Sequence, residues 1–375
     1  MRRLIFSILV LMLCAPLAAQ TDRVFTDDLG VSYTVERYLV ANYPVALAFA
    51  PDGRLFYTEK NTGSVRVVAP DGTRQVEPVI TLPSSALAER GLLGIALDPD
   101  YETNGYIWVA HIAEATARDF ASNNIVRFTE QDGVGSDPQV MFAAPITNNA
   151  LIHMGGNLRF DPDGYLYFSI GDNEIPANSQ DLSTPQGAIH RFAVVDDELV
   201  PAPGNPFEDS SIYAYGLRNP FDFTIDTTGE RLRIFATDNG DQCDDKVNLI
   251  LPGFNYGMGP GYTCGGTAAD IDLTYYQPPL VSFTPSEAPT GIVVYDHEAV
   301  PEWRGELFFC AWNSGLIRRM TLNDSRNRME SMTELDTGGA QCRIGLAVGP
   351  EGGLYFSMVE AEGGAIYRLL PQTAG

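Results

Sequence analysis

One histidine of this chain stands in a setting typical of acid–base chemistry. His153 is followed after one residue by Gly155 and Gly156, which let another group approach the backbone closely. An imidazole titrates near neutral pH and is the usual general base for removing a proton from a hydroxyl group. The other three histidines lie in strand-like runs or in a polar turn. We therefore take His153 as the candidate base.

A second segment, residues 238–245, has the composition of a cation site. It carries four acidic side chains in eight residues, directly after a strand-like run. Hard cations bind oxygen ligands, including main-chain carbonyls in glycine-containing turns, so calcium is the natural candidate. The spacing does not match an EF-hand, because Gly240 is misplaced and no Glu occupies the twelfth position. A solvated acidic loop tied down by Cys243 is the alternative.

Arg218 and Asn219 precede Pro220 in a constrained turn. The guanidinium of an arginine offers a planar fork that suits carboxylates. An arginine that braces a loop by binding main-chain carbonyls is the alternative. Dinucleotide-binding, phosphate-loop, GxSxG and HExxH motifs are missing from the sequence, which argues against nicotinamide enzymes, α/β serine hydrolases and zincin proteases.

The elements that must position these residues repeat along the chain. A phrase of alternating apolar and polar residues, an Asp-Gly-type turn and an aromatic-rich strand begins at residues 46, 94, 156, 221, 291 and 345. Each spacing leaves room for a four-stranded sheet and its loops. We predict an all-β fold, a single six-bladed β-propeller domain with four-stranded blades over residues 21–375. A pair of β-sandwiches would not repeat one phrase six times.

In a propeller, the segments that lead into the inner strands meet near the central axis. Counting back nine or ten residues from the turn of each repeat identifies the residues expected to converge there: Glu89, His153, Arg218, Asn219, and Gln341 beside Arg343. A carboxylate, an imidazole and cations at one point would make a reaction site, although such segments also carry purely structural residues.

The charge of the chain limits its partners. It has 24 Lys and Arg against 48 Asp and Glu, a formal charge of −24, and an acidic surface repels phosphate backbones and anionic lipid. We expect neither nucleic acid nor a membrane surface as a partner. Lys60 and Lys246 are the only lysines, so a site that needs a lysine has almost none to choose from.

Residues 1–20 resemble a secretory signal peptide. Arg2 and Arg3 precede the apolar run 4–13, and small residues follow, with cleavage expected near Ala19 or Gln20. A lipoprotein is less favoured, because the bulky Leu13 precedes Cys14. No later stretch is long and apolar enough to span a membrane. We predict a secreted or periplasmic protein.

The mature chain keeps four cysteines, an even number that suits an oxidising compartment. Cys243 and Cys264 flank a glycine-rich loop, and Cys310 and Cys342 lie in or beside strand-like runs. We favour the pairings 243–264 and 310–342. A zinc site is the rival interpretation, but the sequence has no CxxC pair.

As a set, several phrases resemble the glucose/sorbosone dehydrogenase family, exported six-bladed propellers that use pyrroloquinoline quinone (PQQ) and calcium to oxidise sugars. The similarity runs in order from about residue 40 to 370. The matching phrases are Gly91-Leu-Leu-Gly-Ile-Ala96, His153-Met-Gly-Gly-Asn-Leu158, Tyr215-Gly-Leu-Arg-Asn-Pro220, Asp244-Asp-Lys-Val-Asn-Leu-Ile250 with Asn255-Tyr-Gly257, Pro301-Glu-Trp-Arg-Gly-Glu-Leu307 and Gly349-Pro-Glu-Gly-Gly-Leu-Tyr355.

The resemblance implies a role for each candidate residue. His153 would remove the proton of the sugar's C1 hydroxyl while hydride passes to the quinone, and Asp245 would support His153. The main-chain carbonyls of Gly240 and Asp241 would hold calcium, a Lewis acid toward the quinone. By position, Arg218, Asn219 and Arg343 would contact the cofactor. Glu89 would contact the substrate, in place of a Gln of the family.

The chain also departs from the family pattern. The cofactor-binding lysine of the family falls at Asn313, and an arginine pair falls on Cys342 and Ile344 with only Arg343 between them. A Gln becomes Phe221. PQQ carries three carboxylates, and each charge-assisted bond is worth about 1.5–3 kcal/mol, so the loss of several cations weakens binding. Lys60 and Lys246 lie elsewhere and are not obvious substitutes.

Three functions remain open from the sequence. The first is PQQ- and calcium-dependent oxidation of an aldose to its lactone, with electrons passed to an external acceptor. The second is a non-catalytic propeller of the same family that binds a saccharide or a protein, as Hedgehog-interacting proteins show for this fold. The third is a calcium-dependent, lactonase-like hydrolase whose carboxylates bind the metal directly.

Overall fold

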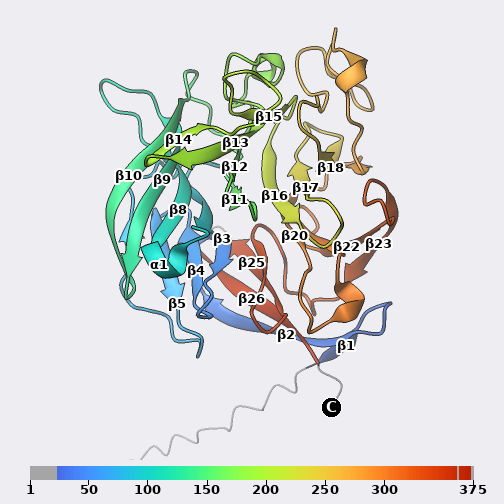
Figure 1. The fold of residues 1–375 in the computed structure, drawn as a ribbon. Coiled ribbons are helices and arrows are strands. Elements are labelled where there is room, and N and C mark those ends of the chain that lie inside the picture. The colour runs from blue at the N-terminus through green and yellow to red at the C-terminus, as the bar shows by residue number, and fades with distance from the viewer. Residues whose placement is uncertain (1–22, 361–362, 373–375) are drawn as a thin grey trace, which may run out of the picture.

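The computed structural model describes residues 23–360 and 363–372. Within these residues the strands form six antiparallel sheets arranged around a central axis (Figure 1). This confirms the predicted six-bladed β-propeller. The predicted signal peptide lies outside the described residues.

The first three blades in chain order share a meander of consecutive antiparallel strands. Their strands are β3 Pro44–Phe49, β4 Leu55–Glu59, β5 Ser64–Val68, β6 Ile80–Thr81; β7 Leu92–Leu97, β8 Tyr106–Ala113, β9 Ser122–Gln131, β10 Val134–Pro145; and β11 Leu158–Phe160, β12 Leu166–Ile170, β13 Ala188–Val195, β14 Glu198–Pro201, with β15 Ile212–Tyr215 added beside β13.

The other three blades follow the same plan, and the last of them takes strands from both ends of the chain. Their strands are β16 Pro220–Asp226, β17 Arg233–Asp238, β18 Asp245–Ile250, β19 Val281–Phe283; β20 Pro289–Val294, β21 Leu307–Ala311, β22 Ile317–Leu322, β23 Met329–Leu335; and β24 Leu346–Val348, β25 Leu354–Glu360, β26 Gly363–Pro371 with β1 Val24–Thr26 and β2 Ser32–Val40.

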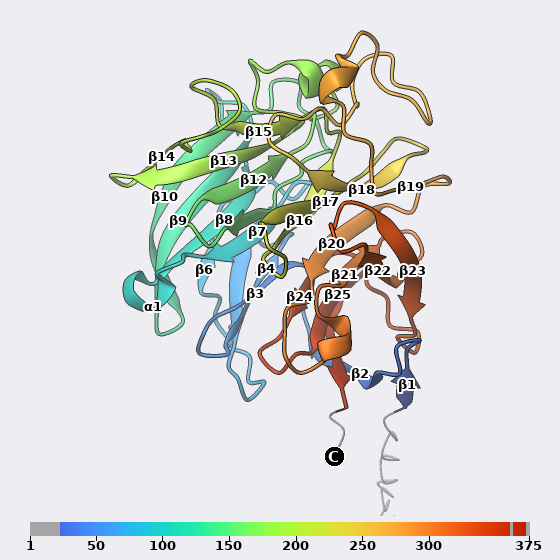
Figure 2. The same cartoon turned by 45° about the vertical axis from the view of Figure 1, so that its right-hand side comes forward.

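Between residues 23 and 372, with 361–362 left aside, helical structure is confined to short turns. These are the helix α1 Tyr101–Asn104 and the 3-10 turns Pro176–Gln180, Leu273–Tyr275 and Pro301–Trp303. The loops that contain the turns at 176–180 and 273–275 rise together at the top of the molecule in Figure 2. No helix among the described residues is long and apolar enough to cross a membrane.

The repeats predicted from the sequence coincide with the inner strands. Each copy begins inside, or within two residues ahead of, β3, β7, β11, β16, β20 or β24. These first strands contact the first strands of the neighbouring blades, as expected around an axis. The segments just before these strands therefore meet near the axis, and their residues form the site described below.

The ring is closed by pairing of the chain ends. Strand β2 pairs with β26, so that the blue and red ribbons of Figure 1 lie side by side in one sheet. Hydrophobic clusters fill all six boundaries between blades; for example, Phe56 packs with Val109 between the first two blades. Full burial of such a side chain stabilises the fold by about 1.5–3 kcal/mol.

Both predicted disulfides are confirmed. Cys243–Cys264 ties the loop before β18 to the long loop after it. Cys310–Cys342 joins β21 to the segment before β24, and so links two neighbouring blades. The close group formed by Cys243, Asp244 and Cys264 holds its two sulfur atoms in a covalent bond, which leaves them no role as zinc ligands.

Candidate active site

Three of the residues predicted to converge are in direct contact. One carboxylate oxygen of Glu89, Oε2, accepts hydrogen bonds from the main-chain N–H of His153 at 2.7 Å and from Asn219 Nδ2 at 3.4 Å. The main-chain N–H of Gly155 donates to Asn219 Oδ1 at 3.0 Å. Segments before β7, β11 and β16, far apart in sequence, thus meet at one point.

His153 is held by a carboxylate that the sequence analysis missed. Its Nδ1 lies 2.7 Å from Asp172 Oδ1, and both side chains are more than nine-tenths buried. An ionised carboxylate on Nδ1 fixes the ring orientation and leaves Nε2 as the basic nitrogen. Close approach explains Gly171 beside Asp172, because a Cβ there would lie 2.1 Å from the His153 carbonyl oxygen.

The prediction that Asp245 supports His153 is wrong. The Asp245 carboxylate accepts hydrogen bonds from the N–H groups of Gly240 at 2.7 Å and Ala288 at 2.6 Å, and from the Ser286 hydroxyl. Asp245 opens β18, the third strand of its own blade, whereas Asp172 follows β12 in the blade of His153. Because β11 and β12 are antiparallel, the residues before β11 and after β12 lie at the same end. That register argument would have identified Asp172.

Arg218 braces the loop after β17. Its Nη1 donates to the carbonyl oxygens of Asn239, at 3.0 Å, and Gly240, and its Nη2 lies 3.6 Å from Asp241 Oδ1. This is the bracing alternative left open from the sequence. The turn itself is fixed by buried Asp238, which accepts the N–H groups of Arg218 and Asn219 at 3.1 and 2.8 Å. Burial raises the pKa of Asp238 to about 6, against the opposing charge of Lys246.

The oxygen donors of this loop have the chemistry of a calcium site. Two main-chain carbonyls and the Asp241 carboxylate converge on one positive centre, the Arg218 guanidinium. Calcium binds the same types of oxygen ligand. The donor set therefore fits a hard cation.

A cavity of about 370 Å³ lies on the propeller axis at these residues; we call it the axial cavity. Its volume falls in the range of pockets for small organic ligands. Aromatic side chains of Tyr43, Phe221 and Trp312 and polar groups of Lys60 and Glu89 line it, together with Val45, Ala88, Leu93, Asn219, Asn239, Ala288, Thr290 and Ile344. The sequence analysis did not place Lys60, Tyr43 or Trp312 here.

Arg343 supports the wall of the axial cavity. Its Nη1 donates to the Trp312 carbonyl oxygen at 2.7 Å, and its Nε and Nη2 donate to Gln341 Oε1. The guanidinium also lies 5.5 Å from the centroid of the Trp312 ring. Asn313, at the position of the family's lysine, is exposed and donates to the Ser286 carbonyl oxygen at 2.8 Å.

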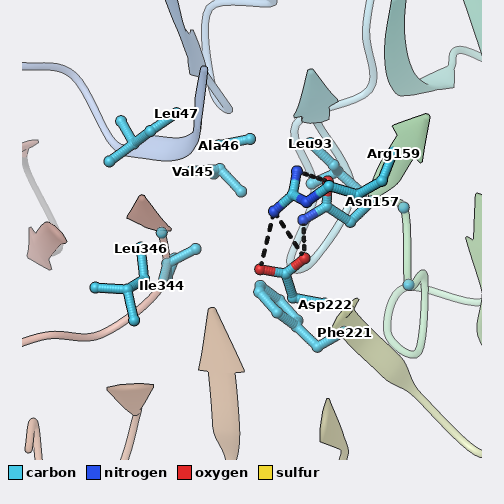
Figure 3. Close-up of a pocket in the computed structure, with 13 residues that line it drawn as sticks. Val45, Ala46, Leu47, Leu93, Asn157, Arg159, Phe221, Asp222, Ile344 and Leu346 are labelled. Carbon is cyan, nitrogen blue, oxygen red and sulfur yellow. Dashed lines mark hydrogen bonds and ion pairs between the residues drawn. The ribbon is translucent and has the colours of Figure 1, made fainter. Parts of the chain in front are cut away.

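Further along the inner strands the axis is closed. Asp222 accepts hydrogen bonds from Asn157 Nδ2, from Arg159 Nη2 at 3.2 Å, and from the N–H groups of Phe223 and Ile292. Figure 3 shows Asn157 and Arg159 reaching Asp222, with Val45 and Ile344 opposite. The space left there is about 20 Å³, room for one water molecule. We call Asn157, Arg159 and Asp222 the axial plug.

The fold and this geometry define a propeller with a small-molecule cavity on its axis beside a histidine–carboxylate pair. A family profile described as Glucose / Sorbosone dehydrogenase matches residues 41–368. The chain therefore belongs to the glucose/sorbosone dehydrogenase family.

The relatives include proteins named as aldose sugar dehydrogenases and one named as a Hedgehog-interacting protein. Aldose sugar dehydrogenase of Escherichia coli is 26% identical over 348 residues, 88% of this chain and 91% of that protein. The PQQ-bound structure of aldose sugar dehydrogenase from Streptomyces coelicolor is 26% identical, with a TM-score of 0.73 over 91% of this chain and 98% of that chain. Mouse Hedgehog-interacting protein is 29% identical over 58% of this chain and 36% of its own length.

Proposed function

We propose that this protein is a PQQ- and calcium-dependent dehydrogenase that oxidises an aldose at C1 to the lactone. The observation that carries the proposal is the buried His153–Asp172 pair, one hydrogen bond away from Glu89 in the wall of the axial cavity. Family membership and the PQQ-bound relative support the cofactor. The two disulfides fit an oxidising compartment, and we propose a periplasmic or secreted location.

Each residue of the site has a distinct role in this proposal. His153 Nε2 takes the proton of the C1 hydroxyl, and Asp172 holds the ring in the tautomer that makes this possible. Glu89 accepts hydrogen bonds from the sugar hydroxyls, and Asn219 fixes Glu89 in place.

The cofactor would take up the axial cavity. Tyr43, Phe221 and Trp312 supply aromatic walls for a planar ring system, and the loop 239–241 supplies oxygen ligands for calcium. A bound PQQ would supply the acceptor for the hydride from C1, and His153 would take the proton of the hydroxyl, so that both hydrogens removed from the sugar are accounted for. Arg343 contributes by holding Trp312.

The test uses purified protein incubated with PQQ and Ca²⁺, with dye reduction followed for a panel of aldoses. We expect aldose-dependent reduction that is lost in His153→Ala and kept in His297→Ala, since His297 is a surface histidine that bonds the Pro350 carbonyl. Absence of dye reduction with every aldose, in protein shown to bind PQQ, would overturn the proposal.

A second candidate is a binding propeller without catalysis. Asn313 replaces the family's lysine, and the Arg343 guanidinium is already engaged by Trp312 and Gln341, which leaves few cations for a tricarboxylate. Binding of a saccharide without binding of PQQ at micromolar concentration would favour this function. The lactonase-like alternative gains no support, because Asp244 and Asp245 accept hydrogen bonds from main-chain N–H groups and a serine hydroxyl of the protein.

A further inference from the structure

Lys60 is a buried cation in the wall of the axial cavity. It is the only lysine or arginine among the described residues that line this cavity, and it is 6% exposed. Its Nζ lies 2.8 Å from Asn61 Oδ1 and 3.4 Å from the Ala86 carbonyl oxygen, both neutral acceptors. Lys60 takes part in none of the ion pairs formed within residues 23–360 and 363–372. Burial of an ammonium with no carboxylate within ion-pair distance is costly, and an anionic partner would reduce that cost.

The neighbouring backbone is built to admit this side chain. A Cβ at Gly91 would lie 2.3 Å from Lys60 Cγ and 2.7 Å from the Lys60 carbonyl oxygen. The backbone is fixed on both sides, because Lys60 N–H donates to the Tyr43 carbonyl and Leu92 N–H donates to the Lys60 carbonyl. The ammonium also lies 4.9 Å from the centroid of the Tyr43 ring. The backbone contacts therefore hold Lys60 in the wall of the cavity.

The arginines nearest the site are committed elsewhere. Arg218 donates to the carbonyls of the 239–241 loop, and Arg343 donates to Trp312 and Gln341. Burial lowers the pKa of Lys60, while the charge of Glu89 opposes that shift. An anionic ligand in the cavity would act in the same direction as Glu89 and stabilise the ammonium.

We propose that Lys60 binds a carboxylate of the ligand of the axial cavity and so replaces the cation that the family has at position 313. The ligand class is a planar aromatic carboxylate, because the ammonium lies near the Tyr43 ring and the rings of Phe221 and Trp312 line the same cavity. This inference rests on the proposed function where the ligand is PQQ. It also corrects the sequence analysis, which set Lys60 aside.

The first test measures the dissociation constant of PQQ in the presence of Ca²⁺ by quenching of tryptophan fluorescence. Lys60→Met keeps the length of the side chain and removes the charge, and we expect affinity to fall about ten- to hundredfold. Lys60→Arg should stay within a few-fold of the wild type. Asn313→Lys, at an exposed position beside Trp312, should restore much of the affinity when added to Lys60→Met. Wild-type affinity in a folded Lys60→Met variant would overturn the inference.

A second measurement separates this inference from the proposed function. Only two side-chain amines exist, so acetylation read by mass spectrometry compares Lys60 directly with Lys246. Benzene-1,3,5-tricarboxylate serves as a probe of the same ligand class, and we expect it to protect Lys60 while Lys246 is unchanged. Protection of Lys60 without PQQ binding would support the inference and overturn the quinone function. Equal labelling with and without both ligands would overturn the inference, whatever the activity.

Discussion

The axial cavity and the axial plug are built from the same inner strands but treat charge in opposite ways. In the plug, the Asp222 carboxylate accepts hydrogen bonds from four residues, Arg159 among them, and about 20 Å³ of space is left. In the cavity, Lys60 has only neutral hydrogen-bond partners, and Glu89 faces a space of about 370 Å³. Beside the cavity, the hydrogen bond between His153 and Asp172 uses Nδ1 and not Nε2.

This difference separates the residues that stabilise the fold, in the plug, from the residues proposed to serve the reaction, at the cavity. Plug residues lie on or beside the ladders of β11 and β16, where main-chain N–H groups point at the carboxylate. The site residues Glu89, His153 and Asn219 lie in the segments before β7, β11 and β16, and His153 has a left-handed backbone with φ of 61°. Such conformations are costly and persist where the surroundings enforce them. Substitutions should therefore affect activity in the cavity and folding in the plug.

The largest expected effect is on turnover in His153→Ala. Loss of the general base should lower kcat about 10²- to 10⁴-fold, because such proton transfer contributes that much to catalysis. The midpoint of thermal unfolding should stay close to that of the wild type. Steady-state kinetics and a melting curve on the same preparation check both statements, and a normal kcat would remove His153 from the mechanism.

Next comes the plug, tested by Asp222→Ala. The substitution leaves Arg159 and two main-chain N–H groups without their acceptor, and breaking a buried pair costs about 3–5 kcal/mol in the free energy of unfolding. Urea denaturation measures it, with Asp324→Ala as the matched control at an exposed aspartate. Equal stability of the two variants would contradict the role given to the plug.

A third expectation concerns a histidine that has a structural role, in contrast to His153. His190 is buried, bonds Ser211 and the Pro185 carbonyl, and burial lowers its pKa from 6.5 to about 4. The unfolded state then binds more protons between these values, so the stability it contributes is complete above pH 6.5 and is lost as pH falls toward 4. The loss is about 3 kcal/mol.

The check is urea denaturation of wild type and His190→Gln at pH 7.5 and pH 4.5. The variant should lose less stability on acidification than the wild type, whatever its stability at pH 7.5. An identical loss in both proteins would show that His190 is not responsible.

The smallest effect is expected for Asp172→Asn. The amide keeps the shape but no longer stabilises a positively charged imidazole, so kcat should fall about ten- to hundredfold while KM changes little. The acidic limb of the pH–rate profile should shift at the same time, which a purely structural role would not produce. An unchanged profile with unchanged kcat would mean that the short contact to Nδ1 has no catalytic consequence.

The sequence was informative wherever a pattern repeats. Six copies of one phrase predicted six inner strands, and counting back from their turns brought Glu89, His153 and Asn219 together. Both disulfides were predicted, because four cysteines allow few pairings and their positions in the sequence favoured these two. These inferences depend only on the order and connection of the strands, which a repeated sequence pattern predicts directly.

The residues that were missed depend on register and side-chain direction. Asp172 and Lys60 each follow the second strand of their blade, so neither stands in a segment before an inner strand. Arg343 was expected near the cofactor, yet its guanidinium turns to Trp312 and Gln341. One residue of register decides which face a side chain takes, and a single sequence does not specify that register.

Our central proposal is that the axial cavity holds a quinone that oxidises an aldose while His153 takes the proton of the C1 hydroxyl. An anaerobic single-turnover measurement tests it most directly: protein loaded with PQQ and Ca²⁺ is mixed with excess aldose without dye, and the lactone is quantified. We predict one lactone per bound PQQ in the wild type and a rate lower by at least about a hundredfold in His153→Ala. Saturation with PQQ and no lactone from any aldose would contradict the account.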